Sequence, residues 1–239
     1  SNNLANVNTT GFKRGQATFQ DLMYQNVRQP GAQSSEGTQL PSGLTLGTGV
    51  RTVSTQKLFT QGNITQTSNP LDMAIDGRGF FMISKPDGTP AYTRDGSFQL
   101  DADVRLVTAN GFELQPSIAV PEDAKSVTIG SDGTVSAQVP GAQEPVVLGS
   151  IQLADFANPA GLQAVGDNLF EETGASGSPL IGTPALTGLG SLLQGSLETS
   201  NVNTVEEMVK MIETQRAYEI NSKSISTADE MLQTLNRQL

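Results

Sequence analysis

The stretch GFFMISKPDGTPAYTRDGSFQLD, residues 79 to 101, decides the fold because it alternates short strand-like runs with turn signals. Two Asp-Gly pairs lie within it, Asp87-Gly88 and Asp95-Gly96. Such pairs suit type I′ turns, which need positive φ at both central residues. The runs around them, FFMIS (80–84), AYTR (91–94) and SFQL (97–100), carry the aromatic and β-branched residues that strands favour. The stretch therefore predicts consecutive antiparallel hairpins.

The same pattern continues on both sides of this stretch. Further Asx-Gly pairs stand at Asp76-Gly77, Asn110-Gly111 and Asp132-Gly133. The additional strand candidates are RLVT (105–108), FELQ (112–115), residues 127–129 and 135–139, SIQLADF (150–156) and NLFEE (168–172). No strand-helix-strand alternation is visible, which argues against a Rossmann fold. The prediction is a mainly β, antiparallel domain over residues 71–195, shaped as a sandwich or barrel.

The C-terminal block predicts one long helix. All 12 Pro lie between Pro30 and Pro184, the last Gly is Gly195, and residues 196–239 contain neither. A helix from about 204 to 239 would be roughly 54 Å long at 1.5 Å per residue. Its start has two possible caps: Asn203 with Glu206 three residues on, or Thr204 with Glu207. Both glutamates also suit the positive end of the helix dipole.

A seven-residue repeat of apolar residues runs along this helix and is typical of a coiled coil. The repeat is Met211, Tyr218, Ile225, Leu232 and Leu239, widened early by Val205, Met208 and Ile212 and late by Ala228 and Leu235. An amphipathic helix packed on its own domain is the alternative, but so long a helix usually needs a partner.

The N-terminal part is less regular. Residues 15–27 place Phe19, Leu22, Met23 and Val27 at helical spacing, which predicts a short amphipathic helix. Residues 29–49 are rich in Gly, Ser, Gln and Pro and read as a flexible loop. We extend this linker or insert to residues 29–70.

Composition excludes several classes of function. The chain has a net charge of −10, which disfavours nucleic acid and anionic lipid as partners. It contains no Cys and no His, so Ser-His-Asp and Cys-His catalysis and zinc sites built on those residues are impossible. No run approaches the roughly 18 apolar residues of a membrane span, so no membrane insertion is expected.

Three short patterns could carry chemistry, and each fails a geometric requirement. Gly77-Arg78-Gly79 begins a dinucleotide fingerprint, but position 82 is Met and no helix is expected to follow. Asp101 and Asp103 lack the rest of a calcium loop. Glu171 and Glu172 are adjacent and on a strand would point to opposite faces. We therefore expect no enzyme activity, no cofactor, and neither a catalytic nor a metal site.

Three segments together resemble the bacterial flagellar rod, hook and hook-associated axial proteins. These are SNNLANVNTTGFKR at 1–14, the opening stretch at 79–101, and ETSNVNTVEEMVKMIETQRAYEINSKSISTADEMLQTL at 198–235. Residues 24–51 resemble the insert that distinguishes distal rod proteins from hook proteins. One departure is Val104, where the family usually has Gly. Because Val tolerates positive φ poorly, we expect that turn to differ in type or length.

The resemblance implies a structural subunit of the basal-body distal rod. Its N- and C-terminal helices would pair as a coiled coil in the inner tube of a helical polymer, with the β domain outside. Residues 1–28 would then hold the remnant of an N-terminal helix that is largely missing here, followed by the short helix. Residues 196–239 would form the C-terminal coiled-coil helix. The self-assembly residues would be Leu4, Val7, Phe12, Val205, Met208, Met211, Ile212, Tyr218, Ile225, Leu232, Leu235 and Leu239. With half of that element absent, we expect this chain to be largely monomeric.

The resemblance also implies partners and a location. The subunit would polymerise with itself and contact proximal rod and hook proteins, the surrounding rings and the flagellar type III export apparatus. It would be exported without a cleaved signal peptide and form a hollow drive shaft across the periplasm. Three alternatives stay open: another axial protein, such as a hook or proximal rod protein; a secreted carbohydrate-binding or hydrolytic β-domain; and an acidic β-domain with a dimerising coiled coil.

Overall fold

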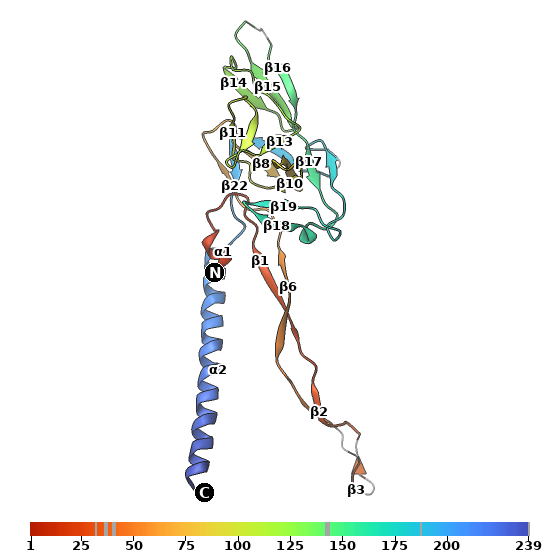
Figure 1. The fold of residues 1–239 in the computed structure, drawn as a ribbon, viewed down its shortest axis with the longest axis vertical. Coiled ribbons are helices and arrows are strands. Elements are labelled where there is room, and N and C mark those ends of the chain that lie inside the picture. The colour runs from red at the N-terminus through yellow and green to blue at the C-terminus, as the bar shows by residue number, and fades with distance from the viewer. Residues whose placement is uncertain (32, 36–37, 40–41, 142–143, 187, 239) are drawn as a thin grey trace. The chain divides into compact units, whose positions relative to one another are not determined.

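A computed structural model shows the fold (Figure 1) and describes every residue except 32, 36–37, 40–41, 142–143, 187 and 239. For 33–35, 38–39, 235–236 and 238, the backbone alone is described. The chain divides into two compact units. The larger unit joins residues Ser1–Arg14 to Phe59–Leu239, and the smaller unit is Gly15–Leu58.

The larger unit is a β domain with a helix at each end of its chain. Its helical elements are α1 (Asn2–Ala5), the 3₁₀ turn η1 (Pro159–Gly161) and α2 (Thr204–Gln238). Its strands are β7 (Ile64–Gln66), β8 (Met73–Asp76), β9 (Phe80–Ser84), β10 (Pro90–Thr93), β11 (Phe98–Leu100), β12 (Leu106–Thr108), β13 (Glu113–Gln115), β14 (Ser126–Ile129), β15 (Thr134–Gln138), β16 (Val146–Ser150), β17 (Leu153–Asp155), β18 (Gln163–Gly166), β19 (Leu169–Glu171), β20 (Leu180–Gly182), β21 (Ser191–Gln194) and β22 (Ser196–Glu198).

The sheets are antiparallel and sandwich-like. The largest runs in the order β11-β12-β13-β9-β10-β19-β18, with β17 pairing both β9 and β20. Smaller sheets are β14-β15-β16, β21-β8 and β22-β7. Among the described residues no sheet closes into a barrel, so the sandwich is the correct one of the two predicted shapes. The mainly antiparallel β class is confirmed.

Strand β9 lies at the centre of the domain and feeds two cores. Phe81 and Ile83 belong to the larger apolar cluster, which also holds Phe98. Phe80 and the half-buried Met82 pack into a second cluster that is rich in aromatic rings. Alternate residues of a strand point to opposite faces, so the first four residues of FFMIS are all apolar because both faces of the strand are covered.

The predicted strands agree closely with the structure. FFMIS is β9 without any shift, and the runs at 91–94, 97–100, 105–108 and 112–115 correspond to β10 to β13 within a residue or two. The later candidates correspond to β14, β15, β17 and β19. β-Branched and aromatic runs bounded by turn residues located these strands, whereas β7, β8, β16, β18, β20, β21, β22 and the strands of the smaller unit were not predicted.

The hairpin turns differ from the expected type. At Asp87-Gly88, Asn110-Gly111 and Asp132-Gly133 only the glycine has positive φ, whereas type I′ needs it at both positions. In each turn the glycine N–H bonds the carbonyl three residues back, as Gly88 N does to Lys85 O at 2.9 Å. The residue that supplies this carbonyl also donates its own N–H to the carbonyl of the residue after the glycine, as Lys85 N does to Thr89 O at 3.1 Å. This is a type I turn followed by a glycine bulge.

Val104 occupies the glycine position of a fourth turn of the same kind. Its φ is 59°, its N–H bonds Asp101 O at 2.9 Å, and Asp101 N bonds Arg105 O at 3.0 Å. Val104 thus takes the conformation that glycine takes in the other three turns. The surrounding strands β11 and β12 hold Val104 in a left-handed conformation that costs roughly 1–2 kcal/mol for an L-residue with a side chain.

The smaller unit is a two-stranded ribbon. Its strands are β1 (Gly15–Asp21), β2 (Gln25–Arg28), β3 (Gln33–Ser35), β4 (Thr38–Gln39), β5 (Leu44–Leu46) and β6 (Val50–Lys57). They pair antiparallel as β1-β6, β2-β5 and β3-β4. The residues omitted from description within 29–49 fall in this unit, so the flexible-loop prediction is only partly covered.

The short helix predicted for 15–27 is wrong, because that segment forms β1 and β2. Residues 50–57, VRTVSTQK, are rich in the β-branched residues that favour strands and supply β1 with a partner from Gly15↔Lys57 to Asp21↔Val50. Helical spacing of four apolar residues was too weak a signal against this distant pairing. The linker drawn over 29–70 correspondingly contains β6 and β7, and β7 already belongs to the larger unit.

The C-terminal helix is confirmed as one uninterrupted element (Figure 1). It begins at Thr204, so residues 196–203 of the predicted helical block are instead β22 and a short connector. At the other terminus only the four-residue α1 is helical, with Asn6 as its C-terminal cap residue. The NVNT run at 6–9 thus follows a helix end, and the NVNT run at 201–204 leads into a helix start.

Candidate assembly site: the terminal helix and its junction with the β domain

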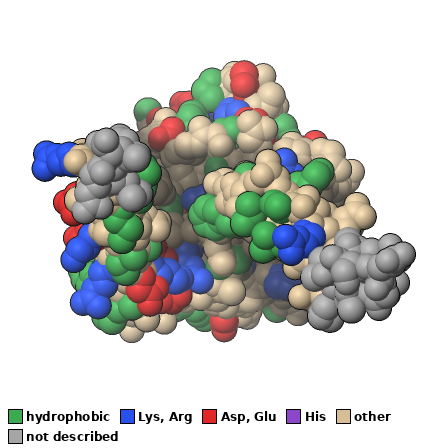
Figure 2. Space-filling model, turned by 90° about the horizontal axis from the view of Figure 1, so that it is seen from below, with side chains coloured by type: hydrophobic (Ala, Val, Ile, Leu, Met, Phe, Trp, Pro, Cys, Tyr) green, Lys and Arg blue, Asp and Glu red, His purple; other side chains and the backbone are tan. Residues whose placement is uncertain are grey.

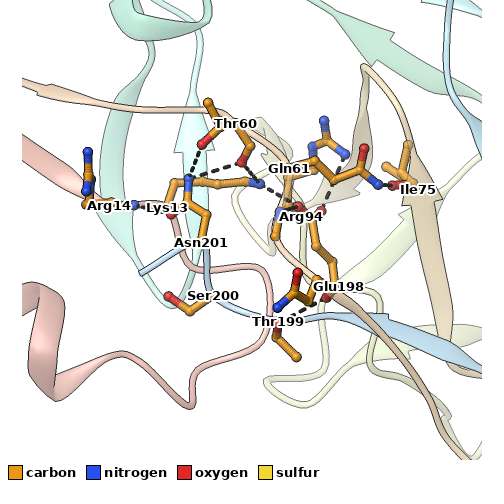
Figure 3. Close-up of polar contacts among 12 residues, drawn as sticks. Lys13, Arg14, Thr60, Gln61, Ile75, Arg94, Glu198, Thr199, Ser200 and Asn201 are labelled. Carbon is orange, nitrogen blue, oxygen red and sulfur yellow. Dashed lines mark hydrogen bonds and ion pairs between the residues drawn. The ribbon is translucent and has the colours of Figure 1, made fainter. Parts of the chain in front are cut away.

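Three passages of the larger unit meet where α2 begins. They are residues 10–14 after α1, residues 59–63 before β7, and residues 196–203 around β22 (Figure 3). Backbone hydrogen bonds join the first and third passages, from Gly11 N to Glu198 O at 2.8 Å and from Asn201 N to Phe12 O at 3.4 Å. Thr199 N bonds Asn63 O at 2.8 Å and ties in the second. We call this meeting point the junction.

A buried ion cluster of Lys13, Glu198 and Arg94 lies inside the junction (Figure 3). Lys13 Nζ is 2.6 Å from Glu198 Oε1 and also donates to Thr60 O at 2.9 Å. Arg94 Nη1 is 3.4 Å from Glu198 Oε2. Gly62 N donates to the same carboxylate at 2.8 Å. One carboxylate therefore connects all three passages to the end of β10.

The cluster is buried and carries more positive than negative charge. Lys13 and Glu198 are each 1% exposed, and Arg94 is 4% exposed. Burial lowers the pKa of the Lys13 ammonium, because desolvation outweighs the attraction of Glu198. Burial likewise lowers the pKa of Arg94, whose guanidinium lies 5.4 Å from the centre of the Phe80 ring. Removing one partner from such a buried pair typically costs about 3–5 kcal/mol. The arrangement stabilises the junction.

Asn201 cross-links the connector between β22 and α2. Its Oδ1 accepts from Arg14 N at 2.7 Å, and its Nδ2 donates to Thr60 O at 3.0 Å and to Thr60 Oγ1 at 2.9 Å. These bonds hold the connector to both neighbouring passages. Asn6 is the equivalent residue of the first NVNT run. Its side chain does not cross-link passages in this way, because it donates to Asn2 O within the α1 turn.

The start of α2 shows which of the two predicted caps is used. Asn203 Oδ1 accepts from Val205 N at 3.0 Å and from Glu206 N at 3.4 Å, and Glu207 N bonds Asn203 O at 3.1 Å. Asn203 is therefore the N-cap, and Thr204 is the first helical residue.

The carboxylates of this first turn bind the N-terminal passage. Glu206 pairs with Arg14 at 2.9 Å and with Lys210 at 2.6 Å, and these hydrogen bonds lower its pKa. Glu207 accepts from Asn3 Nδ2 at 3.1 Å. Only one half of the predicted capping box therefore forms. The Asn203 side chain caps the backbone of the first turn, whereas the two glutamates bond residues 1–14 and Lys210.

The structure separates the predicted self-assembly residues into three groups. Phe12 is buried in the junction of this chain. Leu4 and Met211 are half-buried and line a hollow between α1 and α2, and the half-buried Val7 lines another at the junction. The remaining described members are well exposed: Val205, Met208, Ile212, Tyr218, Ile225 and Leu232. The side chain of Leu235 and the whole of Leu239 lie outside the described residues.

Figure 2, seen from below, shows apolar side chains at the surface among charged ones. Along α2 the exposed apolar set is larger than predicted, because Val209, Ile220 and Met231 are also exposed, by 48%, 65% and 62%. Ile220 and Met231 line a shallow groove on the helix with Ser224 and Ala228. These positions do not follow the seven-residue repeat, which explains why that pattern missed them.

The candidate chemical sites have ordinary structural partners. Gly77 and Gly79 have positive φ and lead into strand β9, which rules out a dinucleotide turn at a helix start. Asp101 and Asp103 pair with Arg105, and Glu171 pairs with Lys85. Across the described part of the chain no group of three or more acidic residues could hold a metal ion. In the same part, no helix is long and apolar enough to cross a membrane.

Sequence reasoning missed the junction. Lys13, Arg94 and Glu198 lie up to 185 residues apart, and no local pattern pairs them. The one available signal was a charged residue directly after Phe12 in the run GFKR, inside an N-terminal segment that otherwise carries no charge before position 13.

Comparisons with known proteins agree with this architecture. Residues 74–137 match the flagellar hook protein FlgE/F/G D1 domain, and residues 193–238 match the flagellar basal body rod FlgEFG protein C-terminal family. The chain is 57% identical to flagellar basal-body rod protein FlgG of Buchnera aphidicola subsp. Acyrthosiphon pisum, over 99% of this chain and 91% of that protein. It is 49% identical to FlgG of Borreliella burgdorferi, over 99% and 90%. It is 32% identical to flagellar hook-basal body complex protein FlhP of Bacillus subtilis, over 99% and 91%.

Identity at this level over nearly the whole of both chains is decisive. The chain belongs to the family of flagellar basal-body rod proteins.

Proposed function

We propose that this chain is a structural subunit of the flagellar distal rod, which polymerises into a stiff, hollow shaft that carries torque from motor to hook. Its relatives are named basal-body rod proteins, which supports the rod as its location. Proximal rod and hook proteins, the surrounding rings and the flagellar export apparatus are its proposed partners. Export without a cleaved signal peptide and passage of the rod across the periplasm belong to the same proposal, as does a role without enzyme activity.

The exposed apolar surface of α2 is the observation that carries the assembly proposal. Tyr218, Ile225 and Leu232 are 76%, 65% and 60% exposed, and α2 is 35 residues long. Burying a large apolar side chain is worth roughly 1.5–3 kcal/mol, so covering several of them supplies substantial association energy. A coiled-coil contact with an N-terminal helix and with neighbouring subunits would cover this seam. A repeated contact between different surfaces that does not close produces a helical filament.

Ile225→Asp, introduced into the chromosomal gene of a motile strain, tests this seam. A carboxylate placed in the contact would be desolvated without a partner, so we expect rod assembly and motility to be lost. Ser226→Asp is the matched control, because it adds the same charge about 100° further round the helix. Electron microscopy of basal bodies and a swimming assay give the readouts. Circular dichroism of the purified variant should show an intact β domain. A motile strain carrying Ile225→Asp would remove the proposed role.

The ribbon of the smaller unit is the second proposed assembly element. Eight large apolar residues on it are exposed by half or more: Phe19, Met23, Tyr24, Val27, Leu44, Leu46, Val50 and Val53. A two-stranded ribbon is marginally stable alone in water, so a surface of this kind is expected to be covered in the assembled state. We propose that it wedges between rod subunits and suppresses bending.

Deletion of residues 24–51 tests the ribbon separately from the helix. The deletion leaves most of β1 and β6 in place and removes most of the exposed apolar side chains. We expect a polymer that is more curved and more compliant, seen by electron microscopy. A straight rod of unchanged stiffness would contradict the wedge, and would leave the proposed role of α2 unaffected.

A further inference from the structure

We propose that residues 10–14 form a strap between the β domain and α2. Through this strap, the first turns of α2 are ordered only when the β domain is folded. Glu198 holds the strap in place through its buried ion pair with Lys13, and we call this pair the lock. The strap holds the β domain with one part and α2 with another. In the free subunit, residues 204–214 would therefore be ordered while residues 215–238 fray. This inference concerns the unassembled chain and does not rest on the proposed function.

The first half of the strap is fixed to the β domain. Thr10 Oγ1 donates to Asp95 Oδ1 at 3.0 Å, and Asn168 Nδ2 donates to Thr10 O at 3.1 Å. Gly11 has φ of +67°, and a Cβ there would lie 2.6 Å from Asp95 N, so the strap runs in close contact with the turn after β10. Lys13 Nζ then enters the buried cluster with Glu198. These contacts form only when the β domain is folded.

The second half of the strap holds the start of α2. Arg14 N donates to Asn201 Oδ1 at 2.7 Å in the connector. Arg14 Nη1 lies 2.9 Å from Glu206 Oε1 and 3.9 Å from Glu207 Oε1. Glu206 and Glu207 both lie in the first turn of the helix. Arg14 is thus one residue from Lys13 of the lock and in direct contact with the helix.

The remainder of α2 has no comparable anchor. Within the described part of the helix, the side-chain hydrogen bonds after Thr214 run only to carbonyls three or four residues back, as from Ser224 Oγ to Ile220 O. Helix nucleation in water is unfavourable, because the first turn fixes several residues for a single hydrogen bond. An external clamp on the first turn removes that cost and leaves the distal turns to fray.

This clamp depends on the folded β domain because its partners lie far apart in the sequence. Arg14 and Glu206 are separated by 192 residues, and Lys13 and Glu198 by 185. Neither contact can form locally, so the strap reaches α2 only after the sheets have brought both chain ends together. The N-cap Asn203 is local and acts whether or not the β domain is folded, which separates the two effects.

Hydrogen exchange with mass spectrometry on the whole chain tests the strap. In the unaltered protein we expect residues 204–214 to be protected at least about tenfold more than residues 215–238. Glu198→Gln should lower protection in both 10–14 and 204–214 by at least about tenfold more than it lowers protection in β9. Arg14→Met lies outside the buried cluster, and should lower protection in 204–214 alone. Lys223→Met, on the distal helix, is the control and should change neither.

Two results would overturn the proposal. One is equal exchange of 204–214 in the unaltered protein and in Arg14→Met, which shows that the helix start orders itself. The other is an equal loss of protection in β9 and 204–214 for Glu198→Gln, which makes Glu198 a general stabilising residue. If Glu198→Gln does not fold, Arg14→Met decides on its own. Neither outcome bears on whether the assembled rod uses α2.

Discussion

Three glycines of the larger unit separate the cost of a steric clash from the cost of a left-handed backbone. Gly96 has ordinary φ, but an added Cβ would lie 1.6 Å from Met73 O and 2.7 Å from Met73 C. Gly88 has φ of +79° and nothing within 4 Å of the added atom. Gly174 has ordinary φ and the same open space. Alanine at each position therefore changes one factor at a time.

The clash at Gly96 should dominate. Carbon and oxygen atoms in contact stay more than 3 Å apart, so the backbones of Gly96 and Met73 would have to separate by well over 1 Å. Met73 is fully buried and its N–H bonds Gly96 O at 3.0 Å, so the shift would break a buried hydrogen bond and disturb the larger core. Loss of the bond costs about 1 kcal/mol, and strain in a packed core adds about 1–3 kcal/mol. We expect Gly96→Ala to destabilise the domain by about 3 kcal/mol or more.

The other two substitutions should both cost less. Gly88→Ala should cost about 1 kcal/mol, from the left-handed φ alone. Gly174→Ala should be neutral, or stabilising by about 0.4–1 kcal/mol, because it reduces the freedom of the unfolded chain. Urea unfolding followed by circular dichroism gives the free energy of unfolding of each variant. A Gly96→Ala variant within about 1 kcal/mol of Gly174→Ala would show that this close approach does not exist in solution.

Three further outcomes follow from the turns and caps. Asn203→Ala should cost about 1 kcal/mol of helix stability, and Thr204→Ala should cost much less. Amide hydrogen exchange in the first turn of α2 measures both. A larger loss for Thr204→Ala than for Asn203→Ala would make Thr204 the N-cap. Hydrogen bonds from residue 134 lower the pKa of Asp132, so its carboxylate stabilises the fold above its ordinary pKa of about 3.9, and that contribution is lost as the pH falls through the lowered pKa. Asp132→Asn should therefore be less stable than the parent near neutral pH, and the difference should disappear as the pH falls through the lowered pKa in urea titrations. Val104→Gly should change the free energy of unfolding by less than about 1 kcal/mol because relief of strain offsets lost packing, whereas Val135→Gly in the core should cost more than about 3 kcal/mol.

The parts of the fold that were predictable from sequence depend on local signals. β9 was found without shift because Phe80 to Ser84 are bounded by glycine and turn residues. The start of α2 was found because Asn203 caps it through its own neighbours, and its length because Gly and Pro end at Gly195. In each case the residues that determine the element are the residues that form it.

The parts that could not be predicted depend on residues far apart in the chain. Phe19 and Val27 read as one face of a helix, but Phe19 lies in β1, which pairs with β6, and Val27 lies in β2, which pairs with β5. The burial of Phe12 was missed, because the backbone bond from Asn201 N to Phe12 O joins residues far apart in the chain. Val104 read as incompatible with its turn because local preference does not reveal how firmly β11 and β12 hold it. Distant pairing overrode local preference in all three.

The two places where the chain leaves and re-enters the larger unit lie side by side. Lys13 Nζ reaches Thr60 O at 2.9 Å, and the residues between them, Gly15–Leu58, form a unit of their own. Chain ends that are close together are what domain insertions need, since the host fold then does not depend on the inserted length. The ribbon can therefore lengthen, shorten or change its sequence over evolution while the β domain and its junction stay the same. Stiffness and assembly could in this way be selected independently within a single gene.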